Sequence, residues 1–174
     1  PYRVIGGPRF YERQETRDAI AYFRIVISKE DDLAFERIVN VPKRGLGKAS
    51  IQSIHHLARS QGISLYDAAR IIVETDELKS KARSALRILI ENFERWRDNL
   101  KILPHNELAS IILDESGYSA MLKNKKDLEN ENKIENLKEL LRAMRDYDNL
   151  QGFLEHVALA TSIDQEWGDE RVNV

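Results

Sequence analysis

The chain of 174 residues contains no cysteine. A disulfide framework, a cysteine-ligated zinc site and a thiol nucleophile are therefore excluded, which favours a reducing, cytoplasmic compartment. No apolar run approaches the roughly 20 residues of a membrane span, and the first residues lack the charged and apolar regions of a signal peptide. We therefore expect a soluble, cytoplasmic chain with no membrane partner.

Recognisable catalytic motifs are missing as well. The sequence has no GxxxxGK(S/T) phosphate loop, no HExxH and no GxSxG, so the mechanisms that depend on those motifs lack their residues. His55 and His56 are consecutive and would lie about 100° apart on a helix, unlike the i, i+4 pair that suits a metal. We expect no catalytic residue, no metal site and no cofactor site within this chain.

Acidic residues are absent from residues 38–65, although 32% of the chain is charged. In the middle of this stretch, residues 40–51 read NVPKRGLGKASI, with an apolar-periodic run on either side. This pattern predicts a hairpin between two helices. Leu46 can plug the hairpin into the space between the helices, while Gly45 and Gly47 can adopt positive φ and let a partner approach the backbone.

The hairpin combines the features of a phosphate-binding surface. The amide groups at the start of the following helix point outward, and the helix dipole adds partial positive charge there. We predict contact with the backbone of duplex DNA through Lys43, Arg44, Gly45, Leu46, Gly47 and Lys48. With about three to four phosphates neutralised, the slope of log K against log salt concentration should be roughly −3.

A plainer interpretation is that the two glycines only form a tight turn whose basic side chains are solvated. The acid-free surround favours the phosphate site over that interpretation. The charge distribution agrees, because residues 1–104 carry 19 Lys and Arg against 14 Asp and Glu, while residues 105–174 carry 8 against 15. We therefore expect DNA on one side of the molecule only.

Helical periodicity covers most of the chain. Asp31 or Asp32, Ser64 and Thr75 stand where they can cap helices. The predicted helices cover residues 10–27, 33–39, 49–60, 65–73, 78–100, 107–115, 119–125, 128–147 and 150–161. The predicted fold class is therefore all-α, with a helix-hairpin-helix-like unit around residues 45–47.

Short strands are predicted at both ends of the chain. Residues 2–5 form a β-branched run closed by a turn, and residues 171–174 form a Val-x-Val run after a solvated loop at 164–170. Since an isolated strand is not stable, each terminus needs a partner. We therefore expect residues 1–174 to be one helical subdomain cut from a longer protein, with its two ends returning toward a common sheet.

Three segments resemble the UvrD/PcrA/Rep group of superfamily-1 DNA helicases. Residues 2–18, YRVIGGPRFYERQETRD, are similar to the family signature YRVxGGxxFxxRxEIKD, and residues 31–47, DDLAFERIVNVPKRGLG, to DDxxFxRIxNxPxRGIG. Residues 133–140, KIENLKEL, resemble the RxENLxEL helix. Leu46 and Thr16 replace isoleucines of the family pattern, and Thr16 puts the packing of its helix in question.

The resemblance implies the 2B subdomain, a helical insertion in the second RecA-like half of such a helicase. It implies an ATP-dependent 3′-to-5′ helicase of DNA repair or replication, whose ATP and Mg²⁺ bind outside this chain. The implied partners are a single-strand/duplex DNA junction, the other helicase subdomains and repair proteins. The strands at 2–5 and 171–174 would lead to and from the 2A motor domain.

Two other functions stay open from the residues themselves. One is an autonomous helix-hairpin-helix DNA-binding module of a repair enzyme. The other is a helical protein-interaction scaffold that uses the acidic helix at residues 128–147. Salt-dependent binding of duplex DNA separates the scaffold from the two DNA-binding functions.

Because no phosphate loop is present, we expect the 174-residue chain neither to bind ATP tightly nor to hydrolyse it. Phosphate release would be measured on highly purified protein. ATP turnover that persists when the expression host carries an inactive helicase would contradict this expectation.

Overall fold

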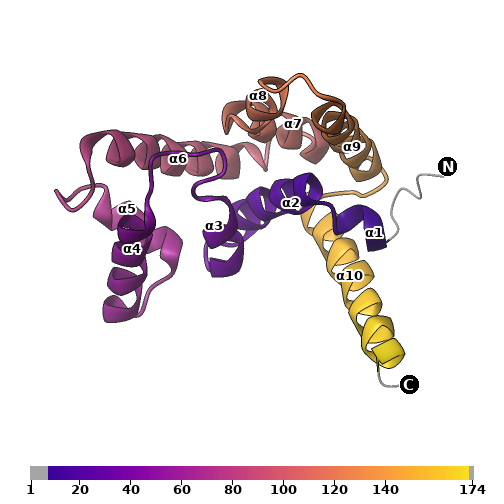
Figure 1. Ribbon diagram of the computed structural model, residues 1–174, viewed down its shortest axis with the longest axis horizontal. Helices are drawn as coiled ribbons and strands as arrows, with labels where there is room; N and C mark the ends of the chain where they lie inside the picture. Colours follow the sequence, from indigo (N-terminus) through magenta and orange to yellow (C-terminus); the bar gives the residue numbers. More distant parts are fainter. Residues whose placement is uncertain (1–7, 173–174) are drawn as a thin grey trace.

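The computed structural model describes the backbone of residues 8–172 and the side chains of residues 9–161. Helices make up most of the described chain (Figure 1), and no strand occurs within it. The mainly α-helical fold class is therefore confirmed. In chain order the helices are α1 (Pro8–Tyr11), α2 (Gln14–Ile27), α3 (Asp32–Ile38), α4 (Lys48–Gln61), α5 (Leu65–Ile72), α6 (Ser80–Asn99), α7 (His105–Glu115), α8 (Tyr118–Lys123), α9 (Leu128–Met144) and α10 (Leu150–Val172).

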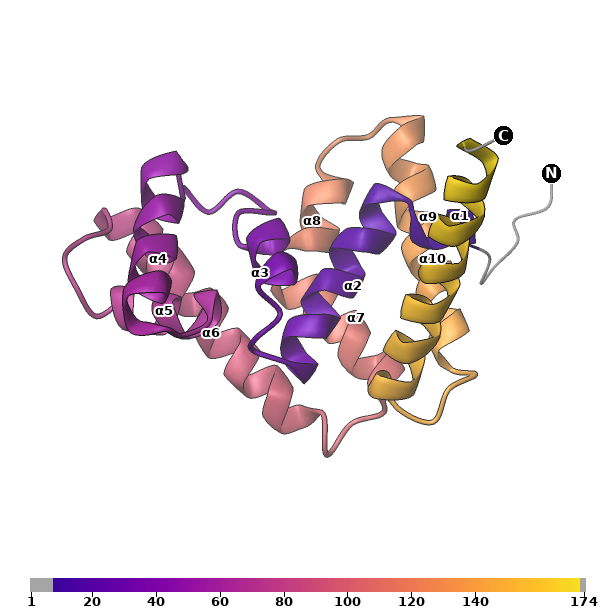
Figure 2. The same cartoon turned by 90° about the horizontal axis from the view of Figure 1, so that it is seen from below.

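Helix α2 is the centre of the fold. Ten of its 14 residues are buried, and it packs against α1, α3, α6, α7, α9 and α10. Figures 1 and 2 show α4 and α5 at one end of the long axis and α1, α9 and α10 at the other. The predicted hairpin, between α3 and α4, therefore lies in the half of the molecule that is farther from the acidic α9.

A chain of buried aromatic rings holds α3 and α5 against the central helix. Tyr22 of α2 stacks on Phe93 of α6 with ring centroids 5.9 Å apart, and Phe93 meets Tyr66 of α5 edge-on at 5.9 Å. Tyr66 in turn contacts Phe35 of α3 at 6.2 Å. Because these four side chains are fully buried, their packing fixes where the α3–α4 connection sits.

Two of the predicted caps are present. The amide of Ala34 donates to Asp31 Oδ1 at 3.1 Å at the start of α3, and the amide of Asp67 donates to Ser64 Oγ at 3.1 Å at the start of α5. Thr75 does not cap α6, because its hydroxyl donates back to the Ile72 carbonyl at 2.7 Å and the helix begins only at Ser80. The predicted helix at 10–27 is divided into α1 and α2.

Buried polar contacts connect the segments that carry the family resemblance. The Asn136 side-chain amide of α9 donates to Glu15 Oε1 of α2 at 2.9 Å. Asp18 of α2 accepts from Arg37 Nε of α3 at 2.8 Å and from the Tyr118 hydroxyl of α8 at 2.7 Å. Segments that are up to 121 residues apart in sequence are therefore joined at the centre of the fold.

The predictions for the C-terminal end were wrong where the structure describes it. Helix α10 runs through Val172, so it includes the predicted loop at 164–170 and the first half of the predicted strand at 171–174. A strand needs a neighbour for its backbone groups, whereas a helix satisfies most of them internally, and the stretch contains no proline. Residues 173–174 and the predicted strand at 2–5 lie outside the described residues.

The helices nearest the two ends of the described chain pack together. The Tyr11 ring of α1 lies 6.3 Å from the Phe153 ring of α10 and 6.1 Å from the ring of His156. The predicted return of the termini to a common sheet concerns residues outside the described range. No helix among the described residues is both long enough and apolar enough to cross a membrane.

Thr16 gives a test of the central packing. Its side chain is fully buried, and its Oγ1 has no hydrogen-bond partner among the described residues. Burying a hydroxyl without a partner costs roughly 1–3 kcal/mol, so Thr16→Val should raise the free energy of unfolding by about 1 kcal/mol. Urea unfolding would measure the change.

Thr75→Val is the matched control, since the Thr75 hydroxyl does have a partner in the Ile72 carbonyl. That variant should be destabilised or unchanged. A Thr16→Val protein less stable than the parent chain would show that the hydroxyl is satisfied.

Candidate nucleic-acid interface

Between α3 and α4, four exposed residues, here called the rim, surround one buried side chain. Lys43, Gly45, Gly47 and Lys48 are exposed, whereas the Leu46 side chain is only 2% exposed. Leu46 thus belongs to the hydrophobic core, as the predicted plug requires, while the helix-hairpin-helix-like unit itself stays a prediction. Any contact of Leu46 with an external ligand would therefore involve its backbone, because its side chain faces the core.

The two glycines have different backbone conformations. Gly45 has φ +78°, in the left-handed region that favours glycine, as predicted. Gly47 has φ −77° and ψ 179°, an extended conformation that any residue can adopt, so the prediction of positive φ is wrong there. A Cβ added to Gly47 would meet no atom within 4 Å. Nothing in the described protein therefore requires glycine at position 47.

Helix α4 begins at this rim with its amide groups uncapped. No side chain caps its first turn, and the first i to i−4 bond runs from the Ile51 amide to the Gly47 carbonyl at 3.1 Å. The amides of residues 48–50 precede that bond, and the helix dipole adds partial positive charge to them. Glycine at the N-cap keeps side-chain atoms away from this cluster of donors.

Arg44 points inward from the rim, toward the body of the protein. Its Nη1 donates to the carbonyls of Ile38 at 2.9 Å and Val39 at 3.1 Å, and also to that of Pro42 at 3.3 Å. Its Nη2 donates to the Tyr22 hydroxyl at 2.7 Å and to the Ser116 carbonyl at 3.1 Å. The guanidinium that we predicted as a phosphate contact is engaged in these internal bonds.

Two further side chains, neither of them predicted, shape the hairpin. The Asn40 Oδ1 accepts from the Arg44 amide at 2.7 Å, and its Nδ2 donates to the Leu46 carbonyl at 2.9 Å. The Tyr22 hydroxyl accepts from Arg44 and donates to the Val41 carbonyl. Burial raises the pKa of Tyr22 above its ordinary value despite the nearby Arg44 guanidinium, so the phenol keeps its proton and can donate.

The basic residues that remain on the rim are Lys43 and Lys48. No ion pair involves either of them within the described range. Of the two consecutive histidines on α4, His55 lies 3.3 Å from Glu36 of α3 and His56 is exposed. Among residues 9–161, no three His, Asp or Glu side chains gather in a way that could hold a metal ion.

Comparison with known protein families identifies the family of this chain. The sequence matches the UvrD-like helicase C-terminal domain over residues 1–174. This chain therefore belongs to that family, and the resemblance to UvrD/PcrA helicases is confirmed.

Individual relatives support the assignment. The chain is 41% identical to a probable DNA helicase II homolog of Rickettsia conorii over 159 residues, covering 91% of this chain and 24% of the relative. It is 38% identical to the ATP-dependent DNA helicase PcrA of Bacillus subtilis over 173 residues, 94% of this chain and 23% of the relative. It is 34% identical to DNA helicase II of Escherichia coli over 168 residues, which cover 91% of this chain and 23% of the relative. The chain thus spans about a quarter of the length of these relatives.

Arg44 can be tested separately from its lysine neighbour. Arg44→Met keeps much of the side-chain volume but removes the Arg44 donor from the carbonyls of Val39 and Ser116, while the Ile38 carbonyl keeps the Val41 amide at 3.0 Å. Hydrogen bonds from a charged group contribute about 1.5–3 kcal/mol each and do not add fully, so the free energy of unfolding should fall by about 2–4 kcal/mol.

Lys43→Met is the matched control and should change the stability by less than about 0.5 kcal/mol, because its side chain is exposed. Both variants would be compared by thermal and urea unfolding. Equal stability of the two would contradict the role of Arg44 in holding the hairpin.

Proposed function

We propose that this chain is the 2B-like subdomain of an ATP-dependent DNA helicase and that its hairpin engages duplex DNA next to a single-strand/duplex junction. The family match over residues 1–174 supports the parent activity. ATP and Mg²⁺ would act in other parts of the longer protein, since the phosphate loop that they require is not in this sequence. Unwinding in the 3′-to-5′ direction and a role in repair or replication belong to the same proposal.

The observation that carries the proposal is the open, glycine-capped start of α4. Gly47 is not needed for its own backbone conformation, and a Cβ there would point into open space. A ligand that comes close to the amides of residues 48–50 would explain why position 47 carries no side chain. A phosphate fits those donors, because they are uncapped backbone N–H groups at the positive end of a helix dipole.

The proposed contact reads the DNA backbone and not the bases. Lys43 and Lys48 supply charge on either side of the glycines, and backbone amides supply directed hydrogen bonds. The hairpin carries no amide or carboxylate side chain on its exposed rim that could distinguish bases. Such a contact suits a helicase, which must hold duplexes of any sequence.

Arg44 supports this contact indirectly. By bonding the carbonyls of Ile38, Val39 and Ser116, it holds the rim in one conformation before DNA arrives. A surface that is already ordered loses less conformational freedom on binding. With only Lys43 and Lys48 as phosphate-neutralising side chains, the hairpin alone would give a salt slope of about −2 instead of −3.

Replacing Gly47 by serine tests the proposal. Serine is a better N-cap than glycine, and its hydroxyl would bond the amides of α4, so stability should be retained or rise slightly. Duplex affinity should fall about fivefold or more, because the side chain fills the space and competes for the amides. Fluorescence anisotropy with a mixed-sequence duplex, run beside a thermal melt, measures both effects.

Lys48→Ala and Lys101→Ala form a matched pair, since both lysines are exposed and Lys101 lies after α6, away from the hairpin. Only Lys48→Ala should weaken binding, with the salt slope flattened by about 0.9. Unchanged duplex affinity in a folded Gly47→Ser protein would end the phosphate-site proposal in favour of a simple turn.

A further inference from the structure

We infer that the duplex-binding surface continues from the hairpin along the whole outer face of α4 as far as Arg59. This inference rests on the proposed function of the hairpin and extends it to a second group of residues. The outer face of α4 is defined here as Lys48, Gln52, His56 and Arg59. Of these four residues, only Lys48 belongs to the predicted hairpin site.

The four residues share one side of the helix. At 100° per residue they fall within an arc of about 80°, opposite the buried Ile54 and Ala58 that face α5. All four are exposed. From the first to the last the helix rises by about 16 Å, which exceeds the axial rise of four successive phosphates along one strand, roughly 3.4 Å each.

No acidic residue lies on α4 or in the hairpin before it. A solvated helix face normally carries both signs of charge, and pairs of opposite charge at i, i+4 stabilise it. Helix α9 has that ordinary arrangement, with Lys133 lying 3.5 Å from Glu129 and Lys138 lying 3.2 Å from Glu135. The outer face of α4 lacks such pairs of opposite charge, so the positive charge of this face is not cancelled within the helix.

Two carboxylates of α3 lie near α4. Asp32 Oδ1 accepts from the Leu65 amide at 3.0 Å. Glu36 lies 3.3 Å from His55, at the edge of the outer face that is turned toward α3. Neither carboxylate forms an ion pair with Lys48 or His56 within the described range.

The same holds for α5, the helix on which α4 packs. Its one carboxylate, Asp67, lies 3.5 Å from Arg70 of the same helix. Arg59 and His56 have no ion pair or hydrogen bond within the described range. An exposed, uncancelled row of positive and protonatable groups beside an anion-binding helix start fits a polyanion better than a protein partner.

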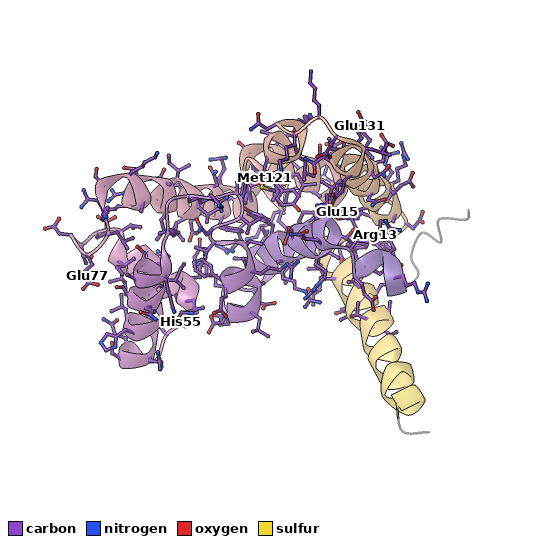
Figure 3. The ribbon with its side chains drawn as sticks, viewed as in Figure 1. Arg13, Glu15, His55, Glu77, Met121 and Glu131 are labelled. Atoms are coloured by element: carbon purple, nitrogen blue, oxygen red, sulfur yellow. The ribbon has the colours of Figure 1, made fainter. Side chains whose placement is uncertain are left out.

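The acidic half of the chain would not compete for this surface. Figure 3 shows His55 on α4 at the opposite end of the molecule from Glu131 of α9. Separation by more than a Debye length, about 8–10 Å at physiological salt, screens exposed charges from one another. The duplex would therefore lie along α4 and away from α9.

The experiment compares Arg59→Ala with Arg145→Ala. Arg145 is an exposed arginine that follows α9. Anisotropy titrations of a mixed-sequence 20-base-pair duplex over a salt series would be run on the 174-residue chain. We expect a slope near −3 for the parent chain at pH 7.5, flattened by about 0.9 in Arg59→Ala and unchanged in Arg145→Ala. Circular dichroism melts confirm that each variant is folded.

The outcomes separate this inference from the function on which it rests. If Gly47→Ser weakens binding while Arg59→Ala does not, the hairpin is a DNA site and the extension along α4 is wrong. If the parent chain shows no salt-dependent duplex binding, both proposals fall. Weakening by Arg59→Ala and Gly47→Ser together supports a continuous surface.

Discussion

The guanidinium of Arg44 joins three parts of the molecule that are far apart in sequence. It bonds the carbonyls at the end of α3, the Tyr22 hydroxyl of the central helix and the Ser116 carbonyl before α8. The guanidinium has five N–H donors in a fixed plane, so it can satisfy more carbonyls at once than the two-donor amide of Asn or Gln. The position of the rim, and hence of the start of α4, depends on this one side chain and on the aromatic packing beneath it.

Sequence reasoning was most successful where periodicity and local chemistry decide the structure. The caps at Asp31 and Ser64, the buried plug at Leu46 and the positive φ of Gly45 all follow from residues within a few positions of one another. These features need only the helical repeat and turn preferences. Helix positions are therefore predictable to within a few residues, except at the C-terminal end, where the low apolar content of residues 164–170 predicts a loop and the structure has helix α10.

The role of Arg44 could not be read from the sequence because its partners are contributed by the fold. Ser116 is 72 residues away, and Tyr22 is 22 residues away on the other side. In the sequence, Lys43 and Arg44 look alike as neighbouring charges of a basic turn. A partial signal was available in the choice of arginine, since its planar group suits several carbonyl acceptors better than an ammonium does. Asn40, four residues before Arg44, was a second signal that the turn has its own internal bonds.

The division between Arg44 and its lysine neighbours has a physical reason. A backbone that offers amides to phosphate must be held still without the help of the ligand, because the ordering cost would otherwise reduce the affinity. In the proposed contact, the multiply bonded Arg44 supplies the rigidity, and the two exposed lysines supply charge without being committed to the protein. In the same proposal, glycine at position 47 leaves open space beside the amides, since a Cβ there would meet no atom within 4 Å. In the proposed contact, rigidity, charge and access are thus assigned to different residues between Lys43 and Lys48, so each can be tested by its own substitution.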